Sequence, residues 1–200
     1  MALPHLKLTY FDGKGRAELA RMIFNYGGIT FTDHRIPRED LAALKSTLPF
    51  GQVPVLEVDG IVFAQSMAIV RYAAKLAGLY PTEALHALKA DMFAYSVIEL
   101  HDSLVEFVFK TSNEAEKAQK KKVFLEETVP KGFAALEKMV AGKFITGDKI
   151  LFVDLQFLDF VENRMPLASH DFNVNNFPKL SSLLANVKEN PKVATYLSKQ

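Results

Sequence analysis

The chain has 200 residues, of which 49% are hydrophobic and 16 are phenylalanine, a composition that argues against disorder and supplies a large core. Its 24 basic and 23 acidic residues leave a formal net charge of +1, which disfavours nucleic-acid binding. It contains no cysteine, so disulfides, thiolate metal sites and a cysteine nucleophile are excluded, and any thiol chemistry requires a thiol supplied by a ligand.

The first residues carry charges within their apolar run and lack the core of a signal peptide. No uninterrupted apolar run approaches the ~20 residues that a membrane helix needs. We therefore expect a soluble, cytoplasmic protein that binds neither membrane nor nucleic acid.

The first eighty residues alternate between strand and helix patterns, in the order βαβαββα. The predicted elements are strand 6–10, helix 16–28, strand 29–36, a weaker helix 38–47, hairpin 55–63, and a helix that begins with Ser66 as N-cap and ends before Gly78. The βαβ unit predicts a parallel pair of strands. Asp59-Gly60 predicts the tight turn of a hairpin that adds antiparallel strands to the same sheet.

The pattern becomes purely helical after a short linker at residues 79–83. The predicted helices are 84–110, 114–140 with a kink at Pro130, 153–165, 177–189 and 191–199. The sequence thus predicts an α/β domain over residues 1–78 and an all-α domain over residues 84–200.

The Val53-Pro54 bond stands directly before the hairpin. A cis bond there fixes a sharp turn, and the backbone N–H and C=O of Val53 would then be free to pair with an extended peptide. The alternative is a trans proline that only starts an edge strand.

Two further features could each bind an anion. Gln65 and Ser66 precede a helix whose first N–H groups and dipole favour a carboxylate, although Ser66 could serve only as a cap. Tyr10 ends the first strand beside a glycine-bearing loop and Arg16, so its phenol could hydrogen-bond an anion. The alternative is a half-buried tyrosine that belongs to the core.

Together, the segments KLTYFDGKGRAE, STLPFGQVPVLEVDG and QSMAIVRYAAK resemble the cytosolic glutathione transferases, and most closely their sigma class. The resemblance covers essentially the whole chain. It implies a thioredoxin-like N-terminal domain, an all-helical C-terminal domain, a homodimer, and glutathione as co-substrate without a metal ion. In this family the Val-Pro bond is cis, and the backbone before it pairs with the cysteinyl part of glutathione.

The resemblance also implies roles for individual residues. Tyr10 would donate a hydrogen bond to the glutathione sulfur, with Arg16 as a nearby cation, and so activate the thiol for conjugation to small hydrophobic electrophiles in detoxification. The implied glutathione-binding residues are Tyr10, Leu41, Lys45, Gln52, Val53, Pro54, Gln65, Ser66 and, from the neighbouring subunit, Glu99 or Asp102. The implied electrophile pocket consists of Phe11, His101, Phe107, Gln156 and Phe160.

The chain departs from the family pattern at three places. Leu41 replaces a tryptophan that many sigma-class proteins use at the glycyl end of glutathione. Leu151 replaces the hydroxyl residue of a helix cap of which Asp154 is kept, and losing such a cap costs about 1 kcal/mol. His101, Asp102 and Gln156 make the expected pocket more polar than that of prostaglandin-isomerising members. Two alternatives remain: a ligand-binding or structural relative such as a lens crystallin, and a glutathione-dependent prostaglandin isomerase.

Overall fold

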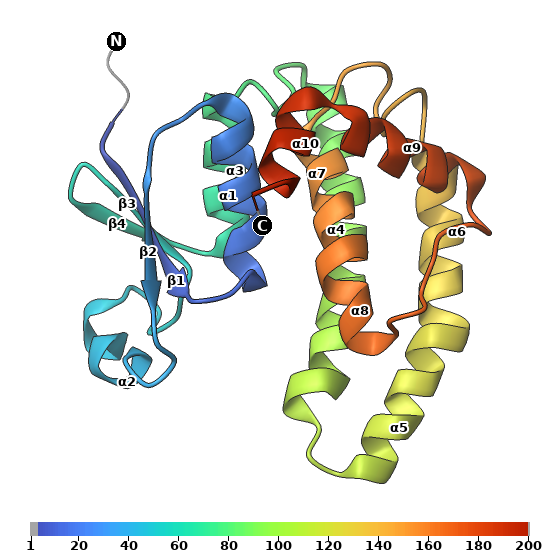
Figure 1. The fold of residues 1–200 in the computed structure, drawn as a ribbon, viewed down its shortest axis with the longest axis horizontal. Coiled ribbons are helices and arrows are strands. Elements are labelled where there is room, and N and C mark those ends of the chain that lie inside the picture. The colour runs from blue at the N-terminus through green and yellow to red at the C-terminus, as the bar shows by residue number, and fades with distance from the viewer. Residues whose placement is uncertain (1–3, 200) are drawn as a thin grey trace. The chain divides into compact units, whose positions relative to one another are not determined.

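The computed structural model describes residues 4–199, which form two compact units (Figure 1). The first unit contains the described residues up to Tyr80 together with those from Pro191 onward, and the second is Pro81–Asn190. The prediction placed residues 191–199 in the helical domain. The structure groups them with the α/β unit instead, because Val193 and Tyr196 of the last helix are buried there against the first helix of the chain.

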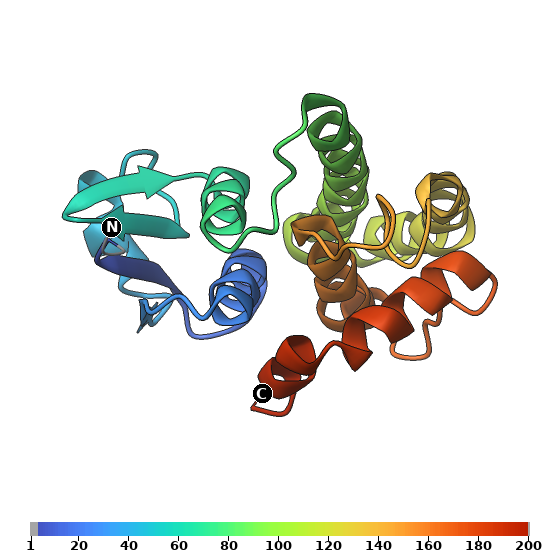
Figure 2. The ribbon, with the colours of Figure 1, turned by 90° about the horizontal axis from the view of Figure 1, so that it is seen from above.

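The first unit contains one four-stranded sheet and four helices. The strands are β1 (Leu6–Phe11), β2 (Thr32–Ile36), β3 (Val55–Val58) and β4 (Ile61–Ala64), and the helices are α1 (Glu18–Gly27), α2 (Leu41–Leu44), α3 (Ser66–Leu76) and α10 (Pro191–Leu197). The spatial strand order is β2-β1-β3-β4, with β1 and β2 parallel and the other pairs antiparallel. Helices α1 and α3 pack together on one face of the sheet (Figure 2). The predicted βαβαββα order and thioredoxin-like fold are confirmed.

The strand register determines which loops share an end of the sheet. Thr9 of β1 is opposite Val55 of β3, and Val55 is opposite Ala64 of β4. The hairpin turn has positive φ at both Asp59 (48°) and Gly60 (85°), as the predicted two-residue turn requires. The end of β1, the start of β3 and the end of β4 therefore lie side by side.

Strand β3 is an interior strand, between β1 and β4. The alternative in which Pro54 starts an edge strand is therefore wrong. The pairing of β3 begins at Val55, one residue after Pro54, so the proline removes no ladder hydrogen bond. The Val53-Pro54 bond is cis, as the family resemblance implied.

Strand β2 is shorter than the predicted 29–36 because the end of α1 uses the first residues of that segment. Gly28 adopts a left-handed φ of 63°, and the Ile29 N–H donates to the Phe24 carbonyl at 2.9 Å. This arrangement closes the last turn of the helix. Residues 28 and 29 thus cap α1 and do not pair in the sheet.

Two predicted helices differ in extent. A 3₁₀ turn over Gly15–Ala17 precedes α1, which begins at Glu18 and not at Arg16. The predicted helix 38–47 is a single turn of α2 followed by a 3₁₀ turn over Lys45–Thr47. Neither turn buries a side chain, so no packed face extends the helix.

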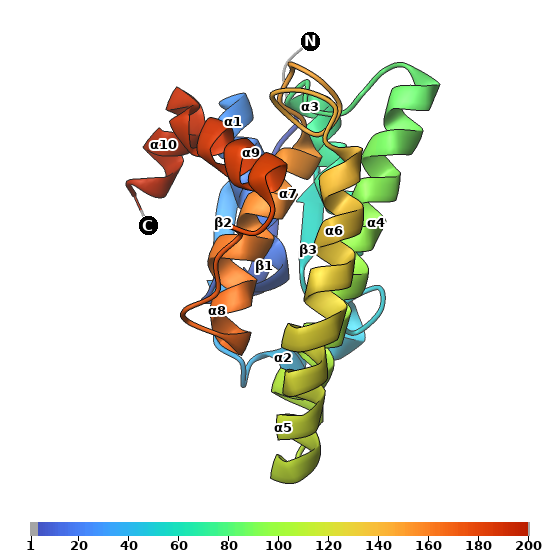
Figure 3. The same ribbon diagram turned by 90° about the vertical axis from the view of Figure 1, so that its right-hand side faces the viewer.

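The second unit is entirely helical. Its helices are α4 (Ala84–Val105), α5 (Glu114–Val123), α6 (Val129–Met139), α7 (Phe152–Asp159), α8 (Met165–Ala168) and α9 (Pro178–Glu189). Helices α4, α6 and α7 pack together (Figure 3) around Phe133, which is fully buried among other phenylalanine rings. Across residues 4–199, no helix is both long and apolar enough to cross a membrane.

Three of these helices continue into π-helical turns, over Glu106–Lys110, Phe124–Thr128 and Phe160–Arg164. The predicted interruption of helix 114–140 is therefore a π-helical turn that ends two residues before Pro130. The proline itself stands in the first turn of α6, where its missing N–H is tolerated.

Asp154 caps α7 from inside the second unit. Its Oδ2 accepts from the Leu151 N–H at 2.7 Å and its Oδ1 from the Ile145 N–H at 2.9 Å, and the side chain is fully buried. Leucine has no side-chain acceptor, so the Asp154 N–H bonds to the Leu151 carbonyl instead, at 3.2 Å. The Asp154 half of the cap is thus present, without the hydroxyl half. The same Asp154 side chain also holds the loop at Ile145.

We expect the contribution of Asp154 to the stability of the protein to fall as the pH rises from about 4 to about 7. Burial raises the pKa of Asp154 from 3.8 to about 7, although backbone hydrogen bonds oppose this shift. Between those values the folded state binds a proton that the unfolded state does not bind. Asp154 therefore contributes most below the unfolded pKa, and its contribution is lost with a slope of up to about 1.4 kcal/mol per pH unit.

Urea unfolding at about pH 5 and about pH 8 measures this effect, with Asp154→Asn as the control that does not titrate. The pH dependence of the wild type should be reduced in the variant. Identical pH dependence in both proteins would show that Asp154 does not carry it.

Candidate functional site

Tyr10 lies near the end of β1 and is half-buried. Its phenol oxygen accepts a hydrogen bond from the backbone N–H of Arg16 at 3.1 Å, so the two predicted catalytic residues are joined through the backbone of Arg16. The ring of Phe11 lies 5.1 Å from that of Tyr10, with the Arg38 guanidinium 5.0 Å from the Phe11 centroid. Because the phenol oxygen already accepts one bond, its hydroxyl hydrogen can be donated to another group.

Gln65 is the N-cap of α3, and not Ser66 as predicted. Ser66 is the first residue of the helix. Gln65 has φ 74° and ψ 106°, a conformation that costs a residue with a side chain roughly 1–3 kcal/mol. Its carbonyl accepts from the N–H groups of Ala68 and Ile69, both at 3.0 Å. The exposed Gln65 side chain thus stands beside the first N–H groups of a helix, where an anion is stabilised.

The loop between α2 and β3 carries further predicted residues. Two successive turns fold it back, with the Leu48 N–H bonded to the Lys45 carbonyl at 3.4 Å and the Gly51 N–H to the Leu48 carbonyl at 3.1 Å. Gly51 has a φ of 61° and packs close to Lys45. Lys45 and Gln52 are exposed, and Leu41 is half-buried on α2. Both polar side chains are therefore accessible to a ligand.

The strand register brings six of the predicted residues to one end of the sheet, which we call the Tyr10 end: Tyr10, Arg16, Val53, Pro54, Gln65 and Ser66. Tyr10 lies near the end of β1, and the others follow β1, precede β3 or follow β4, so all belong to the first unit. The Tyr10 end thus combines a phenol, an unpaired stretch of backbone before β3 and a helix N-terminus.

Glu99 and Asp102, the predicted ligands of a neighbouring subunit's glutathione, are exposed on α4 in the second unit. The His101 side chain is 18% exposed, and its Nδ1 lies 3.9 Å from an Asp102 carboxylate oxygen. Both carboxylates therefore face solvent and can meet another molecule.

The other predicted pocket residues of the second unit belong to its core. Phe107, Gln156 and Phe160 are only 2%, 6% and 2% exposed. The Gln156 amide nitrogen donates to the Ala94 carbonyl at 3.1 Å, so this side chain binds the helix backbone. Among the predicted pocket residues, only Phe11 and His101 retain partial exposure. Helical periodicity could not make this distinction, because core and pocket residues share the same spacing.

Two residues near Tyr10 were not predicted. Gly15 has a φ of 41°, and a Cβ added there would collide with the Tyr10 ring and hydroxyl. Arg21 of α1 is 2% exposed and donates to the carbonyls of Gly13 and Lys14 at 2.7 and 3.2 Å. The glycine-bearing loop was the only sequence signal for the first, and an arginine within an amphipathic helix gives no signal of burial.

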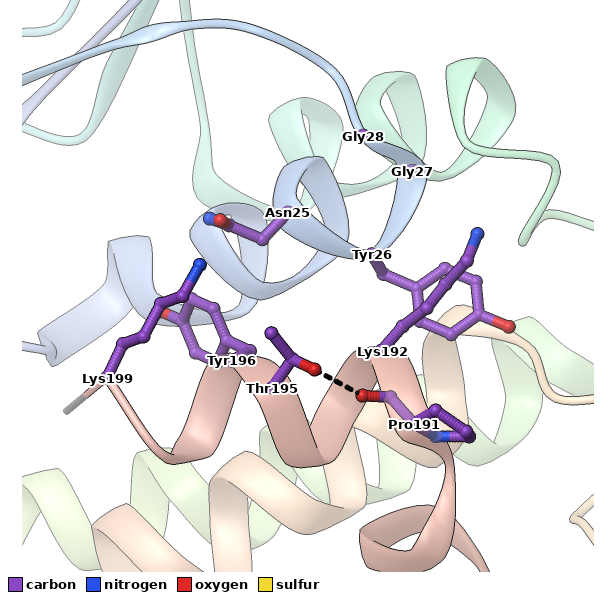
Figure 4. A pocket seen from close by; sticks show the side chains of 9 residues that line it. All are labelled: Asn25, Tyr26, Gly27, Gly28, Pro191, Lys192, Thr195, Tyr196 and Lys199. Carbon is purple, nitrogen blue, oxygen red and sulfur yellow. Dashed lines mark hydrogen bonds between the residues drawn. The ribbon is translucent and has the colours of Figure 1, made fainter.

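Two cavities are lined by none of the residues at the Tyr10 end. One of about 340 Å³ lies between the end of α1 and α10, lined by residues that include Tyr26, Lys192 and Tyr196 (Figure 4). The other, of about 500 Å³, lies between α4 and α6 and includes Glu99. Within residues 4–199, no three His, Asp or Glu side chains are grouped so that they could hold a metal ion.

Family models match both parts of the chain. The glutathione S-transferase N-terminal domain matches residues 6–75, and the glutathione S-transferase C-terminal domain matches residues 98–200.

Individual relatives match over nearly the full length. Glutathione S-transferase 1 of Ascaris suum is 35% identical over 99% of this chain and 98% of its own. Hematopoietic prostaglandin D synthase of Gallus gallus is 31% identical with the same coverage. The solved structure of prostaglandin synthase D of Nilaparvata lugens superposes with a TM-score of 0.89 at 33% identity, covering 98% of each chain.

Proposed function

This chain belongs to the cytosolic glutathione S-transferase family and is a glutathione transferase, and we propose that it activates the glutathione thiol at the Tyr10 end of the sheet. The observation that carries this proposal is the bond from the Arg16 N–H to the Tyr10 oxygen at 3.1 Å. It fixes the phenol and leaves the hydroxyl hydrogen as the donor to a sulfur atom.

The Tyr10 hydroxyl would stabilise the thiolate over the thiol. Lowering a thiol pKa of ~8.5 by ~2 units needs roughly 3 kcal/mol of preferential stabilisation. One hydrogen bond to a charged acceptor contributes about 1.5–3 kcal/mol, so the phenol supplies most of this stabilisation. The positive charge of Arg16 adds to it. Because the chain has no cysteine, the sulfur that reacts must be that of glutathione.

The other residues at the Tyr10 end would hold the tripeptide. Gln65 and Ser66 meet its γ-glutamyl carboxylate at the first turn of α3, where the helix dipole favours negative charge. The Val53 backbone, just before the paired part of β3, binds the cysteinyl part as an added strand would. Lys45 and Gln52 approach from the adjacent loop.

We assign the chain to the sigma class on its three sequence segments, and propose that it conjugates small hydrophobic electrophiles in the cytoplasm for detoxification. An ultraviolet difference titration of glutathione bound to the protein tests the mechanism. Thiolate absorbance should appear well below the free thiol's pKa of ~8.5. If bound glutathione ionises as it does in water, the activation mechanism is excluded and a ligand-binding role is favoured.

Prostaglandin isomerisation is the second candidate. The similarity to hematopoietic prostaglandin D synthase of Gallus gallus favours it, and the burial of Gln156 removes one reason for expecting a polar pocket. Product analysis with a prostaglandin endoperoxide separates the two activities. Turnover of aryl and alkyl electrophiles without isomerised product supports conjugation as the function.

We also propose a homodimer, because each unit exposes a set of large apolar side chains. In the first unit Phe50, Ile61 and Phe63 are 65%, 63% and 50% exposed. In the second, four residues follow one face of α4 at helical spacing: Leu85, Leu88, Met92 and Tyr95. Exposed apolar groups of this kind mark association surfaces, and a second copy of the chain would cover both sets.

The variant Phe50→Ser should weaken the dimer by about tenfold or more, because an aromatic side chain at the centre of an interface contributes about 2 kcal/mol or more. Sedimentation velocity over a concentration series measures the change. The matched control is Phe109→Ser, which removes an aromatic side chain of similar exposure (63%) outside both sets. Equal dissociation constants in wild type and Phe50→Ser would exclude Phe50 from the interface.

A further inference from the structure

We propose that Glu18, Arg21 and Tyr196 form a buried positioning network that holds the loop beneath Tyr10, an inference that rests on the proposed function. Their exposed fractions are 1%, 2% and 7%. The network links α10 to the activating phenol through α1, although Tyr196 lies far from Glu18 and Arg21 in the sequence. None of the three needs to touch glutathione.

The first link connects α10 to α1. The Tyr196 hydroxyl donates to Glu18 Oε1 at 2.7 Å, a buried bond between residues 178 positions apart. Figure 4 shows the Tyr196 side chain pointing from α10 toward α1. The other carboxylate oxygen of Glu18 lies 3.4 Å from Arg21 Nη1. Tyr196 therefore orients the carboxylate that faces the guanidinium.

The second link connects Arg21 to the loop. Its Nη1 donates to the carbonyls of Gly13 and Lys14 at 2.7 and 3.2 Å, while its Nε donates to Asp33 Oδ1 at 2.9 Å. The guanidinium thus joins the loop after β1 to strand β2. Its carbon lies 6.0 Å from the centre of the Tyr10 ring.

The third link runs from the loop to the phenol. The loop segment held by Arg21 leads directly into Gly15, which packs against the Tyr10 ring, and Arg16, whose N–H binds the Tyr10 oxygen. A shift of the Gly13 and Lys14 carbonyls therefore moves the donor that fixes the phenol. Arg21 sets the position of the Tyr10 hydroxyl without contacting it.

A purely stabilising role explains this network poorly. Arg21 Nη2 is buried without a hydrogen-bond partner, and burying part of a guanidinium in this way costs free energy. A buried ion pair is a weak source of stability, whereas it can fix one geometry among several. The exposed bond from Arg35 to Asp12 of the same loop, at 3.1 Å, is open to solvent screening and so holds the loop less firmly.

Two conservative variants test the proposal. Arg21→Lys keeps the charge but loses the planar fork that joins the loop to β2. Tyr196→Phe keeps the ring and loses the hydroxyl that donates to Glu18. The matched control is Thr195→Ala, a neighbour on α10 whose hydroxyl bonds the Pro191 carbonyl within the same helix.

The decisive measurements are the pKa of the bound glutathione thiol, by ultraviolet difference titration, and kcat and KM for glutathione. Arg21→Lys should raise the thiol pKa by about one unit and lower kcat about tenfold, with KM changed less than about twofold. Tyr196→Phe should raise the thiol pKa by about half a unit and lower kcat about threefold. Adding Tyr196→Phe to Arg21→Lys should have little further effect, because both act on one network.

The outcomes separate this proposal from the proposed function. A wild type that does not lower the thiol pKa contradicts the function itself. A wild type that lowers it, with the same thiol pKa and kcat in both variants, overturns the network even if the variants melt earlier. If Arg21→Lys does not fold, the thiol pKa and kcat of Tyr196→Phe alone decide whether the network positions Tyr10. Thr195→Ala should match the wild type throughout.

Discussion

Replacing Tyr10 with phenylalanine should lower the turnover of glutathione conjugation by more than about tenfold while leaving the affinity for glutathione nearly unchanged. The substitution keeps the ring beside Phe11 and removes only the hydroxyl that is fixed by the Arg16 N–H. The lost bond stabilises the thiolate, whereas the tripeptide is held by other residues. Steady-state kinetics with a small aryl halide, together with the ultraviolet titration of bound glutathione, measure both effects.

Tyr26→Phe is the matched control for this experiment. Tyr26 lies on α1, with the Lys192 ammonium 4.8 Å from its ring centre. The variant Tyr26→Phe therefore loses an equivalent hydroxyl at a place outside the Tyr10 end. Its turnover should match the wild type. Near-normal turnover in Tyr10→Phe, or an unchanged thiol titration, would remove Tyr10 from the proposed role.

Replacing Asp154 with alanine should destabilise the second unit by about 3 kcal/mol. The carboxylate accepts from the buried N–H groups of Ile145 and Leu151, and each buried donor left without a partner costs about 1–3 kcal/mol. Leu151 has no side-chain acceptor that could take over. Urea unfolding followed by circular dichroism gives the free energy of unfolding.

Asp148→Ala provides the comparison for that measurement. Asp148 accepts from the Lys143 N–H at 3.5 Å in an exposed loop of the same unit, so its loss should cost less than about 0.5 kcal/mol. A similar small loss in Asp154→Ala would mean that water or a rearranged loop satisfies the two donors. The cap would then contribute little to stability.

The arrangement of the Tyr10 end could be predicted from the sequence because local signals determine it. Asp59-Gly60 sets the hairpin turn, the alternation of strand residues sets the register, and the breaks at Pro54 and Ser66 mark where the paired strands stop. Neighbouring strands then carry their ends to one place. Local signals were sufficient for the strand ends, which depend on a few adjacent residues, whereas the cis Val53-Pro54 bond was expected only from the family resemblance.

Features that depend on distant residues could not be predicted in the same way. Gln65 lies between β4 and α3 with a strained φ of 74°, which a glutamine residue does not predict. Phe107 and Phe160 fit a pocket and a core equally well, and only the packing of the second unit buries them. The bond between Tyr196 and Glu18 joins two segments that no periodic pattern connects.

The return of α10 to the first unit has a consequence for how the protein is synthesised. Val193 and Tyr196 are 1% and 7% exposed, so the core of the first unit lacks part of its packing until the ribosome has translated those codons. The second unit is complete in sequence at Asn190, so its core contains only segments that are translated before α10. The α/β unit is thus the first to be translated and the last whose core can close.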